Sequence, residues 1–311
     1  GKIVPKMRQT ALILYLIYIF LTVLNVIFLV IGGMPLFEAV CHAMGTAGTG
    51  GFGVKADSFT SYSPYIQNVT TVFMLLFGVN FSIYYLILMK KLKSAFFDEE
   101  VRLYFSIVVA TSLLIAWNIR GLYGNFEETL RTSFFQVASM ITTTGFATAD
   151  FDAWPVFSKS LLLFLMIVGA CAGSTGGGMK CARVLILLKS LGRNIKKNIH
   201  PRTVEVIDIN DRGVSEDVIA NTNAYLAAYF TIVVLLVVIL SLDEFSVETN
   251  LSAALCTFNN IGPGLDSVGP TCNFSAYGSI SKIALSLAMI TGRLEIFPIL
   301  SLFSRSTWKK L

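Results

Sequence analysis

Residues 46–51 read Thr46-Ala47-Gly48-Thr49-Gly50-Gly51, a turn of small residues between two hydrophobic runs. The apolar segment before this turn, 34–45, has about 12 residues, whereas a helix that crosses a bilayer needs about 20. Comparable turns follow comparable segments at Thr143-Thr144-Gly145-Phe146-Ala147 and at Asn260-Ile261-Gly262-Pro263-Gly264. The chain therefore contains an internal repeat, in which each short segment fits a re-entrant helix.

The composition indicates a membrane protein. Of the 311 residues, 54% are hydrophobic and 14% are charged, whereas a soluble domain carries about 25% charged residues. The run 10–31 has no charge and, at about 1.5 Å per residue, can cross a hydrocarbon core of roughly 30 Å. It leads into another hydrophobic segment rather than into a small-residue cleavage site, so we interpret it as a span and not as a signal peptide.

Each repeat is predicted to consist of a span, a short helix, a turn and a returning span. The first spans are 10–31, 101–119 and 219–242, the short helices are 34–45, 127–141 and 247–259, and the returning spans are 65–89, 157–188 and 277–303. We therefore expect an all-α polytopic membrane protein with pore repeats at 1–93, 98–193 and 218–311 and a cytoplasmic connector at 194–217. The connector is either an ordinary link or a docking surface.

Charge defines the orientation of the repeats. The net charge of +5 comes from basic residues that cluster where spans end, which indicates topology rather than nucleic-acid binding. The positive-inside bias places these ends in the cytoplasm and the turns towards the outer face. The loops beside the turns are acidic, which either raises the cation concentration at an outer mouth or only solvates the loops.

The turns have the chemistry of an alkali-cation site. Non-helical backbone at membrane depth is tolerated only where protein or a water-filled path satisfies its polar groups, so three such turns imply a shared path. Small uncharged residues present backbone carbonyl and hydroxyl oxygens, the ligands that replace the hydration shell of such a cation. Glycine permits the backbone angles that direct successive carbonyls inward. We expect Gly48, Gly145 and Gly262 to face one another across an ion.

Two further features lie inside returning spans. Cys171-Ala172-Gly173-Ser174-Thr175-Gly176-Gly177-Gly178-Met179-Lys180 predicts an unwound loop, because glycine costs about 1 kcal/mol relative to alanine in a helix. It is not a phosphate-binding loop, which would need adjacent Gly-Lys-Ser/Thr. Arg293 lies well within the last span, either as a functional charge or as a structural partner of Glu295. For Lys180 the simplest explanation is that its side chain extends to the interface.

The segments Thr46-Ala47-Gly48-Thr49-Gly50 and Asn260-Ile261-Gly262-Pro263-Gly264 resemble the potassium-channel filter signature TVGYG. Because three units of short helix, filter and span occur in one chain, the whole sequence resembles the Trk/Ktr/HKT superfamily of potassium transporters, and most closely the bacterial TrkH type. The resemblance implies a potassium-channel-like, pseudo-fourfold pore with filters at 46–50, 143–147 and 260–264.

The same resemblance implies roles for individual residues. K+ would bind the filter residues Thr46, Ala47, Gly48, Thr143, Thr144, Gly145, Asn260, Ile261 and Gly262. The intramembrane loop would obstruct the pore through Gly173, Ser174, Thr175, Gly176, Gly177, Gly178 and Lys180. Arg293 would project into the pore below the filter and oppose cation passage.

The resemblance also implies partners and a location. We expect a prokaryotic inner-membrane homodimer, with a separate pore in each subunit, that takes up K+ and is regulated by a cytoplasmic nucleotide-binding ring of the TrkA or KtrA type. Such families build the pore from four filter segments, and only three occur here, so we expect an upstream repeat outside this sequence. Ala147 and Pro263 depart from TVGYG and imply looser discrimination among potassium, rubidium and sodium.

Two other classes of protein are alternatives to a potassium transporter. The chain could be the channel-like potassium-binding subunit of an ATP-driven potassium pump. A membrane-embedded enzyme would need convergent acid and base groups, and the internal charges Lys282, Arg293 and Glu295 do not make such a site. The five cysteines form no CxxC pair, and the two histidines have no clustered acidic residues, so we expect no transition metal, no organic cofactor and no catalytic residues.

Overall fold

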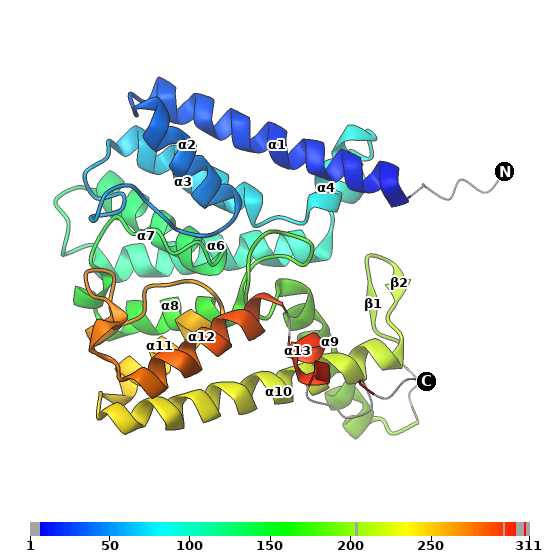
Figure 1. Ribbon diagram of the computed structural model, residues 1–311. Helices are drawn as coiled ribbons and strands as arrows, with labels where there is room; N and C mark the ends of the chain where they lie inside the picture. Colours follow the sequence, from blue (N-terminus) through cyan, green and yellow to red (C-terminus); the bar gives the residue numbers. More distant parts are fainter. Residues whose placement is uncertain (1–6, 203–204, 295, 303–307, 309–311) are drawn as a thin grey trace.

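The structure, a computed structural model, describes residues 7–202, 205–294, 296–302 and 308. Within these residues almost all regular structure is helical, and the long helices lie side by side across the molecule (Figure 1). Three helices are long and apolar enough to cross a membrane, or up to five spans if each bent helix pair counts as one. The predicted all-α polytopic membrane fold is therefore confirmed.

The first part of the chain forms five helices. Their bounds are α1 Met7–Ile31, α2 Leu36–Ala47, α3 Pro64–Phe77, α4 Phe81–Leu88 and α5 Leu92–Phe96. The 25 residues of α1 extend over about 37 Å, enough to cross a bilayer. Ser63 begins α3 by accepting a hydrogen bond from the backbone N–H of Ile66, and Pro64 occupies its first turn, where no donor is lost.

The second part repeats this order with a larger interruption. Its helices are α6 Glu99–Ile119, α7 Phe126–Ile141, α8 Val156–Val168 and α9 Cys181–Ile199, with a 3₁₀ turn at Phe151–Ala153. Asp98 caps α6 by accepting from the N–H of Val101 at 3.0 Å. The segment between α8 and α9 is not helical, as the run of glycines predicts.

The third part starts after the connector. It consists of α10 Glu216–Leu240, α11 Val247–Phe258, α12 Ser279–Arg293 and α13 Ile296–Leu302, with 3₁₀ turns at Ser241–Asp243, Asp266–Val268 and Phe274–Ala276. The connector contains a small antiparallel hairpin of β1 Asp208–Ile209 and β2 Arg212–Gly213. In the described part of the chain, the β-strands lie in this connector.

The returning spans are less regular than the sequence predicts. The run 65–89 was expected to be one helix, but it is divided into α3 and α4, which meet at 88°. Gly78 follows the end of α3, and Asn80 caps α4 by accepting a hydrogen bond from the N–H of Ser82. Residues at the break itself therefore favour the end of one helix and the start of the next. Gly78 also lies where a methyl group would be 2.5 Å from the Tyr104 hydroxyl, so α6 approaches the break closely. In the third repeat, α12 ends at Arg293, and residues 295 and 303 lie outside the described residues.

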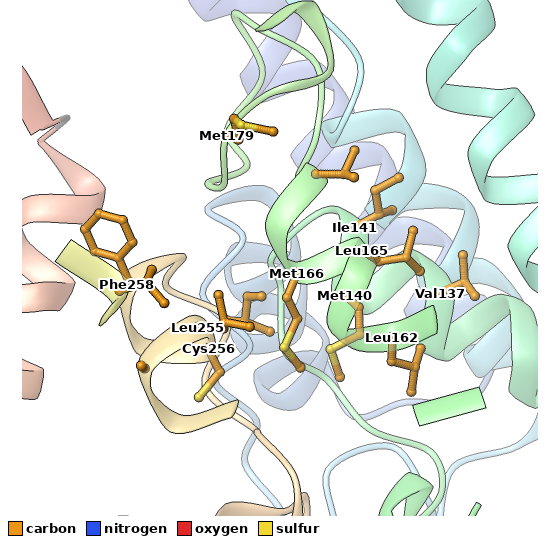
Figure 2. Close-up of a cluster of buried hydrophobic side chains, with 14 of the residues drawn as sticks. Val137, Met140, Ile141, Leu162, Leu165, Met166, Met179, Leu255, Cys256 and Phe258 are labelled. Atoms are coloured by element: carbon orange, nitrogen blue, oxygen red, sulfur yellow. The ribbon is translucent and has the colours of Figure 1, made fainter. Parts of the chain in front are cut away.

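The core of the molecule lies around the short helices. Figure 2 shows side chains of α7, α8 and α11, including Met140, Met166 and Leu255, which point towards one another. These residues belong to a buried cluster that also includes residues of α6, α10 and α12. A second cluster packs α1, α2 and α3 against Phe135 and Phe146. The short helices are therefore held from several sides, which positions their carboxyl ends.

Candidate functional site

The turns that follow α2, α7 and α11 share one backbone conformation. Each first places a non-glycine residue at positive φ: 50° at Thr49, 57° at Thr143 and 56° at Asn260. Two residues later each places a glycine at positive φ: 66° at Gly51, 84° at Gly145 and 107° at Gly262. The left-handed region costs a non-glycine residue about 1–2 kcal/mol, so the surrounding structure must maintain it.

Equivalent hydrogen bonds define the register of the three turns. A backbone N–H returns to a carbonyl five residues earlier in each: Gly50 to Gly45 at 2.8 Å, Thr144 to Ser139 at 2.9 Å and Ile261 to Cys256 at 2.8 Å. The equivalent segments are therefore 49–53, 143–147 and 260–264. The predicted first filter at 46–50 is displaced by three residues.

Thr46, Ala47 and Gly48 consequently lie elsewhere than predicted. Thr46 and Ala47 are fully buried in the last turn of α2, and the Thr46 hydroxyl donates to the carbonyl of His42 at 2.8 Å. Gly48 is the residue that follows the helix, with an ordinary φ of −82°. Gly51, and not Gly48, is equivalent to Gly145 and Gly262. The prediction that Gly48 faces these two glycines is therefore wrong.

The sequence contained a signal for the correct register. The first turn reads Thr-Gly-Gly-Phe-Gly at 49–53, and the second reads Thr-Thr-Gly-Phe-Ala at 143–147. Aligning the shared Gly-Phe pairs would have placed Gly51 with Gly145. The similarity of 46–50 to TVGYG was the weaker guide, because Thr and Ala also fit the end of a helix.

The backbones of successive turns are in close contact. A methyl group at Gly51 would lie 2.0 Å from the carbonyl oxygen of Thr144, and one at Gly145 would lie 1.8 Å from that of Ile261. Only glycine fits such approaches. A methyl group at Gly262 would meet nothing within 4 Å. The turns thus form an arc, first to second to third, with one side open.

The open side of the arc is a groove. Its volume is about 910 Å³, and its walls include Thr49 and Gly50 of the first turn, Asn260 and Gly262 of the third, and residues of α12. The wall provided by α12 includes Met289 and Arg293.

The short helices direct their carboxyl ends at the same place. α2, α7 and α11 end directly before the three turns. Each helix end carries roughly half a negative charge from its unpaired carbonyls, so the convergence favours a cation.

The loop between α8 and α9 lies against the first two turns and against the residue that precedes the third. The Thr49 hydroxyl donates to the carbonyl of Thr175 at 3.0 Å, and the Gly177 N–H donates to the Thr143 hydroxyl at 2.6 Å. A methyl group at Gly177 would lie 2.5 Å from the carbonyl oxygen of Asn259, which directly precedes the third turn. The predicted loop residues 173–178 therefore meet the predicted filter segments at the carboxyl ends of the helices.

Two basic side chains also contact this loop. Arg293 Nη1 donates to the carbonyl of Thr175 at 3.2 Å, and Lys180 Nζ donates to that of Gly176. Lys180 thus folds back onto the loop, and the expectation that it extends to the interface is wrong. Arg293 is the last residue of α12, beside the open groove. Glu295, its predicted alternative partner, lies outside the described residues.

Acidic residues follow the second and third turns closely in the chain, at Asp152 and Asp266. The carboxylate of Asp266 accepts hydrogen bonds from the hydroxyls of Thr249 and Ser246, and these bonds hold its pKa below the usual range. The Asp266 N–H donates to Asp152 at 2.9 Å. Lys159 forms ion pairs with Asp152 and Glu248. This hydrogen-bonded network links the second and third repeats.

The fold and the site define a helical membrane protein with repeated helix-and-turn units that meet at a shared centre. The family described as TrkH, cation transport protein, matches residues 1–124 and 125–310, and this chain belongs to that family. The resemblance recognised in the sequence is therefore confirmed.

Individual relatives agree. The chain is similar to the Trk system potassium uptake protein TrkH of Salmonella typhimurium (35% identity, covering 100% of this chain and 65% of that protein) and to TrkG of Escherichia coli K12 (30%, covering 99% and 64%). It thus spans slightly less than two thirds of the length of these relatives. Its fold is similar to the crystal structure of the potassium transporter TrkH from Vibrio parahaemolyticus, with a TM-score of 0.91 and 31% identity over 99% of this chain and 67% of that one.

Proposed function

We propose that this chain forms most of a pore for the uptake of K+ across the cell membrane. The observation that carries the proposal is the arc of three turns, in which closely packed glycines and positive-φ residues follow three converging helix ends. Such turns offer carbonyl and hydroxyl oxygens in place of water to a cation. The relatives named above are potassium uptake proteins, which favours uptake over a pump subunit.

The proposed K+ ligands follow the register of the turns. They come from Thr49, Gly50 and Gly51 in the first turn, Thr143, Thr144 and Gly145 in the second, and Asn260, Ile261 and Gly262 in the third. The repeats 1–93, 98–193 and 218–311 each supply one such wall.

A fourth wall would close the open side. We propose that a further segment of the complete protein, not among residues 1–311, occupies part of the groove between the third and first turns. The relatives are long enough to contain such a segment. A closed ring would surround the ion, whereas the arc of three exposes it on one side.

The proposed gate consists of the loop and Arg293. Residues 173–178 lie against the filter ends and, together with the charge of Arg293, would obstruct a cation that leaves the filter. Opening would require the loop to leave Thr49 and Thr143. The bonds that hold the loop there are few, which suits a movable element.

The remaining proposals rest on the family resemblance. They are a homodimer in the inner membrane of a prokaryotic cell, a separate pore in each subunit, and a regulatory nucleotide-binding ring on the cytoplasmic side. The basic surface from Lys189 to Arg202 is the proposed docking surface. Several of its basic residues already pair with acidic residues, including Arg193 with Glu216 and Lys196 with Glu205.

The test is growth and uptake by the complete protein. In cells without other potassium uptake systems, its expression should permit growth at low external K+ and saturable uptake of K+ or Rb+. Failure of uptake in cells where the protein reaches the membrane with its partners would contradict the proposal. Co-purification with an ATP-hydrolysing P-type subunit, instead of a nucleotide-binding ring, would support the pump.

A further inference from the structure

One buried carboxylate lies at the base of the loop between α8 and α9. Glu100 is in the first turn of α6, and its side chain is 8% exposed. A buried ionisable group in a membrane protein is costly and requires partners. The neighbouring Glu99 differs, since it is partly exposed and pairs with Lys189.

The partners of Glu100 are the two ends of the loop. Its Oε1 accepts hydrogen bonds from the backbone N–H groups of Ala172 at 2.6 Å and of Ala182 at 3.0 Å. These two residues flank the glycine-rich segment, so a single oxygen of α6 joins the chain that enters the loop to the chain that leaves it. Hydrogen bonds to a charged acceptor are stronger than those between neutral groups.

Other bonds confirm that the ends of the loop form a closed neck. The Cys181 N–H donates to the carbonyl of Ala170 at 2.9 Å, and the Met179 N–H donates to that of Ile167 at 3.2 Å. Cys171 and Cys181 at the neck are fully buried. The tip, 173–178, is mostly partly exposed. Some of its hydrogen bonds reach the turns or a basic side chain, and others reach the break between α3 and α4: the Phe81 N–H donates to the carbonyl of Gly173 at 3.1 Å, and the Thr175 hydroxyl donates to that of Phe77 at 3.3 Å. The neck is therefore fastened to α6 by contacts that are separate from those that hold the tip.

We propose that Glu100 is the positioning residue of this loop, the group that fastens its neck and thereby presents its tip to the filter. The effect of this contact on transport rests on the proposed gating function. The contact itself does not, because it involves only Glu100 and the two ends of the loop. Without the acceptor oxygen, the two ends separate more often and the tip no longer keeps its place below the turns.

The native cysteines allow this to be measured directly. Cys171 and Cys181 report on the neck, and Cys256, fully buried in α11, reports on the rest of the bundle. The complete protein in membranes is treated with N-ethylmaleimide, and the labelling rate at each cysteine is followed by mass spectrometry. The variants are Glu100→Ala, Glu100→Gln and the matched control Glu99→Ala.

Glu100→Ala should accelerate labelling of Cys171 and Cys181 roughly tenfold to hundredfold each, the factor that corresponds to the loss of one hydrogen bond with a charged acceptor at each end of the neck. Cys256 should keep its rate, and Glu99→Ala should leave all three rates as in the wild type. The labelling rates of Glu100→Gln should lie closer to those of the wild type than to those of Glu100→Ala, because the amide oxygen of glutamine still accepts hydrogen bonds. If the alanine variant does not accumulate, Glu100→Asp, whose side chain is one methylene shorter, should show the same acceleration.

Three results would overturn the inference: unchanged rates at both neck cysteines, an equal acceleration at Cys256, or identical rates in the alanine and glutamine variants. Ion flux is measured in parallel. Faster labelling with unchanged flux would keep Glu100 as the positioning residue and contradict the gate, whereas unchanged labelling would overturn the inference whatever the flux.

Discussion

Substitution of Gly145 by alanine tests the arc of turns most directly. The added methyl group would lie 1.8 Å from the carbonyl oxygen of Ile261, whereas ordinary contact begins at 3.4 Å, an overlap of about 1.6 Å. The neighbouring atom is backbone and cannot rotate away, so the third turn must retreat. Because the same carbonyl is a proposed K+ ligand, the shift alters the site itself.

The expected result is a loss of selectivity. Moving one of the proposed coordinating oxygens by more than about 1 Å should reduce the preference for K+ over Na+ at least tenfold, which corresponds to about 1.4 kcal/mol. The measurement is the uptake of K+ and Na+ by proteoliposomes that contain the complete protein, at a fixed membrane potential.

A matched control separates the overlap from backbone strain. Gly33 has a φ of 87°, close to the 84° of Gly145, but a methyl group there would meet nothing within 4 Å. Gly33→Ala should therefore impose similar conformational strain, about 1–2 kcal/mol, without changing selectivity. If Gly145→Ala kept the K+/Na+ ratio of Gly33→Ala, the second turn would not be part of the ion path.

Three further predictions follow from the contacts described above. Thr49→Val should change the K+/Na+ uptake ratio, whereas Thr46→Val should leave it unchanged, because only Thr49 lies in the turn; the opposite pattern would restore the 46–50 register. Arg293→Ala should raise K+ flux several-fold in proteoliposomes, since one positive charge would leave the proposed ion path, and equal or lower flux would remove Arg293 from the proposed gate. Asp266 has a pKa below its ordinary value of 3.8, so its contribution to folding is present above that pH and is lost as the pH falls through the lower folded-state value. Thr249→Val removes the hydrogen bond that lowers the pKa of Asp266 most. The variant should therefore lose stability at a higher pH than the wild type in acid-unfolding curves. Unchanged curves would show that this hydrogen bond does not contribute to stability.

Much of the fold was predictable because it depends on local composition. Runs such as 10–31 have to be helical in a bilayer, where each backbone group needs an internal partner. The break at 171–180 was predictable for a related reason, since consecutive glycines weaken a helix at every position. These features follow from residues that are close together in the chain.

The register of the first turn was not predicted, because packing, and not local sequence, determines where α2 ends. Thr46 and Ala47 are acceptable in a turn and in a helix, and Gly48 follows α2 at a φ that any residue adopts. The left-handed position falls instead on Thr49, whose hydroxyl bonds to Thr175, 126 residues away. Local preference could not distinguish the two registers.

Glu100 was missed for the same reason. At the start of a span, a glutamate is typical of a helix amino terminus, where it is favoured by the dipole. Its bonds to Ala172 and Ala182 join positions 72 and 82 residues away. No pattern near residue 100 contains that information.

Composition and hydrophobic pattern were thus sufficient for the membrane class, the threefold repetition and the interrupted span, because each depends on the surrounding membrane or on the conformational limits of single residues. The family was identified through the resemblance of the turns to a known filter signature. Four features required the assembled structure: the alignment of the turns as 49–53, 143–147 and 260–264, the contact of the loop with Thr49, Thr143 and Asn259, the bend between α3 and α4, and the hydrogen bonds of Glu100. These features depend on contacts between backbone groups that are far apart in the sequence, and the close packing of distant segments determines those contacts.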